Sequence, residues 1–216
     1  MIKKDTLQRF LFNNAPVRGE YIHLDESYQT IIKQHPYPSF VQTLLGQALC
    51  VAGLLTAIIK FEGRLTVQFR GEGKLKLLVA QCDNHFHLRG LIKAEDALTE
   101  AELLGSFRMG TLAIMLDGGP KKERYQGIVP WTGNSLAESI EGYFRASEQL
   151  ATRVWLKVDA TQAAGFMLQV VPSHQDSRDP EEGIGTEAFN RVVVNTGLML
   201  RNQLLTTDCE SLLKEL

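Results

Sequence analysis

Hydrophobic and polar residues alternate along much of this chain. Between Leu65 and Val79 most apolar residues fall on every second position, on either side of the polar turn GEGK at residues 71–74. A period of two places apolar side chains on one face of a strand, so this stretch predicts two strands joined by a hairpin turn. Further strands are predicted over residues 17–24, 85–92, 111–117, 124–131, 154–158 and 165–172. Short strands separated by turn residues indicate an antiparallel meander.

The longest apolar segment lacks this alternation. Residues 40–59 contain no charged side chain, and twenty such residues are long enough to cross a bilayer. Polar residues interrupt the segment at Gln42, Thr43, Gln47 and Thr56, and these side chains fit poorly among lipid tails. We therefore predict a buried central helix, with a membrane span as the alternative.

Shorter helices are predicted where a capping residue precedes an apolar stripe. Asp5 predicts a short helix near the N-terminus, and Asp25 predicts a second that ends near residue 34. An acidic stretch at residues 95–104 predicts a third. Ser135 and Glu138 have the spacing of a capping box and predict a fourth.

The composition changes near the C-terminus. Residues 173–185 contain no aromatic and one aliphatic residue, so we predict a flexible linker. Two helical stretches follow, and the first contains three consecutive valines, Val192–Val194, which make a poor isolated helix. Such a helix either docks on another surface or completes the core. The prediction is an α+β fold with a core domain at 1–172, a linker at 173–185 and a helical arm at 186–216.

The overall composition is that of an ordinary globular protein. Hydrophobic residues make up 44% of the 216 residues and charged residues 22%, with a formal net charge of −2. That balance argues against a broad polyanion-binding surface. No apolar segment follows the N-terminal lysines, so we predict no signal peptide, and three scattered cysteines fit a reducing cytosol.

The strongest candidate for a small-molecule or metal site is a C-x-x-H-x-H cluster. Cys82, His85 and His87 are residue types that bind zinc, but they straddle a predicted turn and lack an evident fourth ligand. An alternative function is a small-molecule-binding domain or enzyme with a pocket around His85, His87 and Arg89. No serine or cysteine stands in a motif with a base, so we predict no catalytic residue and no metal or cofactor site in this chain.

Two other segments have simpler interpretations. GEGK precedes a strand, whereas a phosphate-binding loop leads into a helix, so we predict a hairpin turn. Lys121, Lys122 and Arg124 form a small basic loop, which we interpret as a solvated hairpin end. A nucleic-acid role for this loop would predict binding that falls steeply with salt.

The segment YFRASEQLATR, residues 143–153, concentrates polar residues beside an apolar helical stripe. This pattern fits an active site, a binding surface or a corner between two elements. Helix-end signals precede it and strand signals follow it, so we predict a corner.

Several phrases together indicate a family. They are VRGE (17–20), LLTAIIKFEG (54–63), VQFRGEG (67–73), RYQGIV (124–129), YFRASEQLATR (143–153) and AGFMLQVVP (164–172). In this order they closely resemble the thirty-three-kilodalton heat-shock chaperone family, the redox-regulated bacterial holdases. The resemblance covers roughly residues 1–172 well and the helical arm loosely.

The resemblance implies a cytoplasmic, ATP-independent chaperone that holds unfolding client proteins during oxidative and heat stress. We also predict no nucleic-acid or membrane partner. Family members join an α+β domain, through a metastable helical linker, to a C-terminal redox switch with four cysteines in a C-x-C and a C-x-x-C. These cysteines bind zinc when reduced. Oxidation forms disulfides, releases zinc, loosens the linker and exposes apolar surface, and the activated forms dimerise.

The chain departs from the family pattern at this switch. Cys50, Cys82 and Cys209 stand in neither motif, and the sequence stops inside a predicted helix, about where the switch should begin. Loss of the C-terminus and a member without a switch would both explain this departure, and we favour the first. Zinc is therefore expected in a domain that this chain lacks.

The resemblance leads to a hypothesis for client binding. Two apolar surfaces are expected to cover each other when the arm docks and to bind clients when it loosens. The first is the predicted meander and the second is the arm. Their residues are Leu65, Val67, Phe69, Leu75 and Leu77, and Val192, Val193, Val194, Leu198, Met199 and Leu200.

Overall fold

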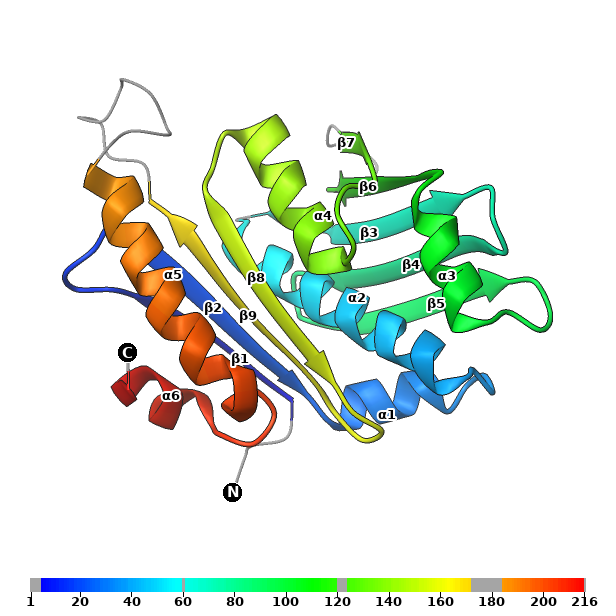
Figure 1. Ribbon diagram of the computed structural model, residues 1–216, viewed down its shortest axis with the longest axis horizontal. Helices are drawn as coiled ribbons and strands as arrows, with labels where there is room; N and C mark the ends of the chain where they lie inside the picture. Colours follow the sequence, from blue (N-terminus) through cyan, green and yellow to red (C-terminus); the bar gives the residue numbers. More distant parts are fainter. Residues whose placement is uncertain (1–4, 60, 120–123, 172–183, 216) are drawn as a thin grey trace.

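The computed structural model describes residues 5–59, 61–119, 124–171 and 184–215. In this part of the chain, two antiparallel sheets lie on either side of the long helix α2 (Ser39–Ile58). The helices α5 (Ile184–Gln203) and α6 (Cys209–Glu215) cover the face of the first sheet that is turned away from α2 (Figure 1). The predicted α+β class is confirmed.

The first sheet joins the two ends of the core domain. Its strand order is β1-β2-β9-β8, formed by β1 (Thr6–Leu11), β2 (Val17–Leu24), β9 (Ala163–Val170) and β8 (Thr152–Val158). β2 pairs with β9 along its whole length, from Val17 opposite Val170 to Leu24 opposite Ala163. Nearly every residue of β9 is buried, because helices cover both faces of this central strand.

The second sheet contains the predicted meander. Its order is β5-β4-β3-β6-β7, formed by β5 (Leu88–Ala94), β4 (Leu75–Asp83), β3 (Arg64–Gly71), β6 (Gly110–Asp117) and β7 (Arg124–Pro130). The predicted GEGK hairpin is confirmed, since β3 and β4 pair antiparallel across it. The shorter helices α1 (Glu26–Ile32), α3 (Glu100–Phe107) and α4 (Leu136–Tyr143) pack around the sheets.

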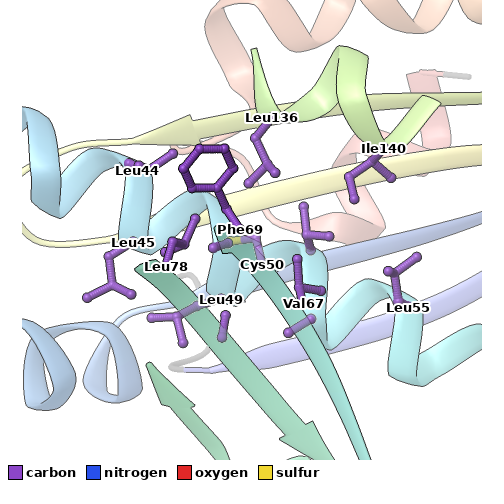
Figure 2. Packing of buried hydrophobic residues seen from close by; sticks show 14 of the residues in the cluster. Leu44, Leu45, Leu49, Cys50, Leu55, Val67, Phe69, Leu78, Leu136 and Ile140 are labelled. Atoms are coloured by element: carbon purple, nitrogen blue, oxygen red, sulfur yellow. The ribbon is translucent and has the colours of Figure 1, made fainter. Parts of the chain in front are cut away.

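The uncharged segment forms the centre of the core. α2 is long and apolar enough to cross a membrane, but 78% of its most apolar window is buried inside the protein. Leu45 and Leu49 of α2 pack with Phe69 and other side chains that point from the second sheet (Figure 2). Packing between two sheets therefore accounts for the apolar character of this helix.

The helix expected after Asp5 is wrong, because residues 6–11 form the edge strand β1. Pairing with β2 satisfies the backbone of this segment and overrides its local helical signal. Asp5 instead caps α1 from a distance: its carboxylate accepts hydrogen bonds from the backbone N–H groups of Asp25 (2.8 Å) and Ser27 (2.9 Å).

The predicted flexible linker falls largely on residues 172–183, which lie outside the described part of the chain. α5 begins at Ile184, two residues before the predicted start of the arm.

Candidate functional site

The arm closes an apolar face of the first sheet. Strand residues and arm residues share one cluster of buried side chains, separate from the core around α2. We call it the arm-covered cluster. Its sheet members are Val17, Tyr21, Ala164, Phe166 and Leu168, and its arm members are Phe189, Leu200, Leu204, Leu205, Cys209 and Leu212.

Among the described residues, few polar contacts hold the arm in place. The Tyr21 hydroxyl donates a hydrogen bond to the backbone carbonyl of Thr207 (3.4 Å), and Lys157 Nζ donates one to the carbonyl of Arg201 (3.2 Å). Within the described ranges, no ion pair joins the arm to the first sheet. The arm is therefore held mainly by apolar burial, and its release would expose apolar surface on both partners.

The six arm residues of the client-binding hypothesis divide by their position on α5. Leu200 is 2% exposed and belongs to the arm-covered cluster, while Val192, Val193 and Met199 pack partly buried against it. Val194 and Leu198 lie one helical turn apart and are 61% and 67% exposed. The docked arm thus covers four of these residues and leaves two in solvent.

The expectation that the meander and the arm cover each other is wrong. Leu65, Val67, Phe69 and Leu75 are completely buried in the α2 core, and the half-buried Leu77 is on the second sheet too. The arm packs on the first sheet instead. Alternation identifies the apolar face of a strand, but it does not identify the element that covers that face.

The structure does not assemble the proposed pocket around His85, His87 and Arg89. All three side chains are exposed near the β4–β5 turn, where His87 Nδ1 lies 3.0 Å from Asp83 Oδ2. The same carboxylate accepts the backbone N–H groups of His85 and His87. Arg89 Nε donates a hydrogen bond to Oε1 of Gln81 on the neighbouring strand. These polar residues shape a turn.

Cys82 does not join these histidines in a metal site, because its side chain is buried on the α2 side of β4. In the described part of the chain, no group of three or more histidine, cysteine or acidic residues is placed to hold a metal ion. Lys121 and Lys122 of the basic loop lie outside the described residues, and Arg124 pairs with Asp117 at 3.4 Å.

The segment YFRASEQLATR forms a corner between α4 and β8. Ser135 caps the start of α4 by accepting the Glu138 N–H. The helix passes into one π-helical segment, Phe144–Glu148, and the chain then turns at Gln149, whose φ of +53° is left-handed. A π-helical segment accommodates an extra residue in a helix, and here it ends the helix before β8.

Two of the phrases that indicate the family meet at this corner. The hydroxyls of Tyr125 and Tyr143 lie 3.0 Å apart, and both donate to Glu148 Oε1, at 2.8 and 3.2 Å. Gly127 is required beside them, because a Cβ there would lie 2.6 Å from the Tyr143 hydroxyl. Tyr125 of RYQGIV and the pair Tyr143 and Glu148 of YFRASEQ therefore connect β7 to the end of α4.

A second carboxylate, Glu141, fastens the corner to the edge strand β8. Glu141 is buried and accepts the Val154 N–H at 2.9 Å and Arg153 Nη1 at 3.0 Å. Its burial raises the pKa of this carboxyl, and the hydrogen bond and the positive charges of Arg153 and Arg145 oppose that shift.

Sequence reasoning did not single out a buried carboxyl on β2. Glu20 is 3% exposed, and its Oε2 has no hydrogen-bond partner. It lies opposite Arg9, whose Nη1 donates to the carbonyl of Ala57 near the end of α2 (3.2 Å). Burial raises the pKa of Glu20 to about 7, although Arg18 and Arg9 act in the opposite direction. The available signal was a glutamate inside a predicted strand that had apolar residues on both faces.

The sequence matches the Hsp33 protein family over residues 5–216. The chain belongs to the Hsp33 family.

Curated relatives in the Hsp33 family carry the name 33 kDa chaperonin. The protein from Ectopseudomonas mendocina is 41% identical over 98% of this chain, and the protein from Methylobacillus flagellatus is 37% identical over 98%. In both cases the match spans 71% of the relative's length. The Hsp33 relative from Nitrosococcus oceani is 44% identical over 85% of this chain and 63% of its own length.

A solved structure shares the Hsp33 fold. The 33 kDa chaperonin (heat shock protein 33 homolog) of Thermotoga maritima superimposes with a TM-score of 0.74, at 22% identity, over 97% of this chain and 73% of that one. Membership of the Hsp33 family supports a chaperone function and suggests a protein that is not an enzyme.

Proposed function

We propose that this chain is an ATP-independent holdase and that its clients bind the face of the first sheet that the arm covers. The arm-covered cluster carries this proposal. It is an apolar surface on a sheet whose strands β2 and β9 pair along their length, and among the described residues few polar contacts hold the helices that close it. Unfolding proteins expose apolar side chains, so an apolar face that opens when the arm leaves has suitable chemistry for holding them.

Both sides of the opened contact would contribute to binding. Tyr21, Phe166 and Leu168 would be uncovered on the sheet, while Leu200 and Leu212 would be uncovered on the arm. Val194 and Leu198 are exposed before release, so they are suited to a first encounter with a client. Four residues of the meander are assigned to the core and not to client binding: Leu65, Val67, Phe69 and Leu75.

We further propose that the chain works in the cytoplasm during heat and oxidative stress, and that the activated form dimerises. Cys50, Cys82 and Cys209 are the three cysteines of this sequence, and we do not assign the redox response to any of them. All three are buried, and burial raises the pKa of Cys82 to about 11, that of Cys209 to about 12, and that of Cys50 as well. Zinc binding and oxidation both require accessible thiolates, so these three residues are poor switch residues.

Light scattering from a heat-unfolding client tests the holdase function, with and without ATP. Leu212→Ala removes a fully buried arm side chain, a change that typically destabilises by about 2–5 kcal/mol, and should loosen the arm. We expect this variant to suppress aggregation at a lower ratio to client than the unmodified chain. Asn202→Ala is the control, because Asn202 is exposed on the same arm and its contact with Thr206 uses the backbone carbonyl.

The outcomes separate two parts of the proposal. If no variant suppresses aggregation, the holdase function is wrong for this chain. If Leu212→Ala speeds amide exchange in α5 and α6 without improving suppression, the arm-covered face is not the client site. Suppression that requires ATP would contradict an ATP-independent mechanism.

A further inference from the structure

A cavity of about 520 Å³ lies where the β1–β2 hairpin meets the arm. Its walls come from the end of β1 and the following loop, from the first half of α5 and from the last turn of α6. The cavity is therefore bounded by both partners of the docking contact. Its volume lies within the range of about 300–1,000 Å³ that is usual for small-molecule sites.

Part of the cavity lining is apolar. The rings of Phe10 and Phe12 meet edge to face with centroids 5.7 Å apart, and Phe10 also contacts the ring of Phe166 at 5.4 Å. Val192 of α5 and Leu213 of α6 line the same cavity, and both are partly buried against the arm-covered cluster. This wall suits a hydrocarbon chain or a ring.

The rest of the described lining is polar and carries one positive charge. Arg191 and Asn195 lie one helical turn apart on α5, and Asn13 and Asn14 line the cavity from the hairpin loop. None of the described residues that line it is acidic. Among the residues that the structure describes, no hydrogen bond or ion pair engages the Arg191 guanidinium, and Glu187, one turn earlier, forms no ion pair with it.

We propose that this cavity binds an amphipathic carboxylate, with its apolar part between Phe10, Phe12 and Leu213 and its carboxylate on Arg191. Arginine binds carboxylates through paired N–H donors, and the Asn195 amide can donate a further hydrogen bond. A free fatty acid of medium chain length has this chemistry. A neutral chain of equal length would leave the guanidinium without an anion.

Such a ligand would contact the β1–β2 hairpin, α5 and α6 together. A ligand that binds the docked arrangement and not the released one shifts the population toward the docked arrangement. If the arm-covered face is the client site, as proposed above, the ligand acts as a negative regulator of holdase activity. This regulatory step rests on the proposed function, whereas the binding site does not.

Titration calorimetry with decanoate tests the site directly. We expect saturable binding with one ligand per chain, and a loss of roughly tenfold or more in affinity for Arg191→Ala, because a charge-assisted hydrogen bond is removed. Arg191 is exposed, so this variant should fold normally. Arg201→Ala is the matched control, because Arg201 is also exposed on α5 and its contact with Lys157 uses the backbone carbonyl. Decanol tests the need for the carboxylate.

Three results would overturn the site: no saturable binding of decanoate, equal affinity for decanol, or equal weakening by the two arginine substitutions. Amide exchange then tests the coupling, and we expect decanoate to slow exchange in α5 and α6 of the unmodified chain but not of Arg191→Ala. Binding with slower exchange but unchanged suppression of client aggregation would leave the site in place and overturn its regulatory role.

Discussion

Replacement of the buried Glu20 by glutamine should change how the stability of this protein depends on pH. Glu20 lies on β2 with its carboxyl enclosed, and burial raises its pKa from 4.5 to about 7. Glutamine has nearly the same shape and carries no charge at any pH. The substitution Glu20→Gln therefore removes one titration and leaves the packing around it intact.

The expected magnitude follows from the difference in pKa between the folded and unfolded chain. A shift of one pKa unit corresponds to about 1.4 kcal/mol, so a rise from 4.5 to about 7 corresponds to about 3 kcal/mol. The folded state holds the proton more tightly than the unfolded state. This contribution is thus fully present below pH 4.5 and is lost as the pH rises through about 7.

Urea unfolding at several values between pH 4.5 and pH 8.5 measures this effect. The free energy of unfolding of the unmodified chain should fall, relative to that of Glu20→Gln, by about 3 kcal/mol across this range. Glu72→Gln is the control, because Glu72 is exposed in the β3–β4 turn and its contact with Lys76 uses the backbone carbonyl. Its difference from the unmodified chain should not change with pH.

Parallel pH profiles for Glu20→Gln and the unmodified chain would refute this reasoning. So would a variant that is less stable than the unmodified chain at pH 8. Either result would mean that Arg9 and Arg18 stabilise the carboxylate by at least as much as its burial destabilises it.

Three further substitutions test the structural contacts. Gly127→Ala should lower the melting temperature, at a cost of about 1–3 kcal/mol, because the new Cβ overlaps the Tyr143 hydroxyl; an unchanged melting temperature would contradict that contact. Tyr37→Phe should destabilise by about 1–3 kcal/mol in urea unfolding, because the Tyr37 hydroxyl both accepts the Ile92 N–H and donates to the Ile92 carbonyl, each at 3.1 Å. Asp5→Ala should destabilise by about 1 kcal/mol and speed amide exchange in the first turn of α1; unaltered exchange would rule out the distant cap.

Hydrophobic periodicity was sufficient to place β3 and α2. β3 alternates in the sequence, and an uncharged segment of twenty residues has to be covered on every side. In β4 the single apolar face predicted from alternation is wrong beyond Leu75. The register shifts between Leu75 and Leu77, so Leu78, Ala80 and Cys82 are buried in the core while Leu77 and Val79 are half-buried. The start of β5 was predicted three residues too early. There the Asp83 carboxylate holds the N–H groups of His85 and His87 and extends the turn, a local contact that periodicity does not reveal.

The division into two sheets was not predictable from local patterns. β2 and β9 pair although almost the whole core domain separates them in the sequence. Neither segment contains a local pattern that identifies the other as its partner. One signal was available for the docking site of the arm. β9 is apolar at nearly every position, which indicates a strand covered on both faces and therefore a second layer beyond α2. The regular alternation of the meander led to the prediction that the arm covers the second sheet, whereas the arm packs on the first.

Heating acts on the docked arm in two opposite ways. The apolar contact with the first sheet weakens on cooling, so warming from low temperature does not by itself loosen it. The helix α5 loses stability as the temperature rises, and the three β-branched residues Val192–Val194 lower its helical propensity. Thermal release should therefore begin in the backbone of the arm and not at the surface that it covers. The proposed release of the arm should therefore shift in temperature when the helical propensity of these twenty residues is altered, even where the apolar face beneath them is unchanged.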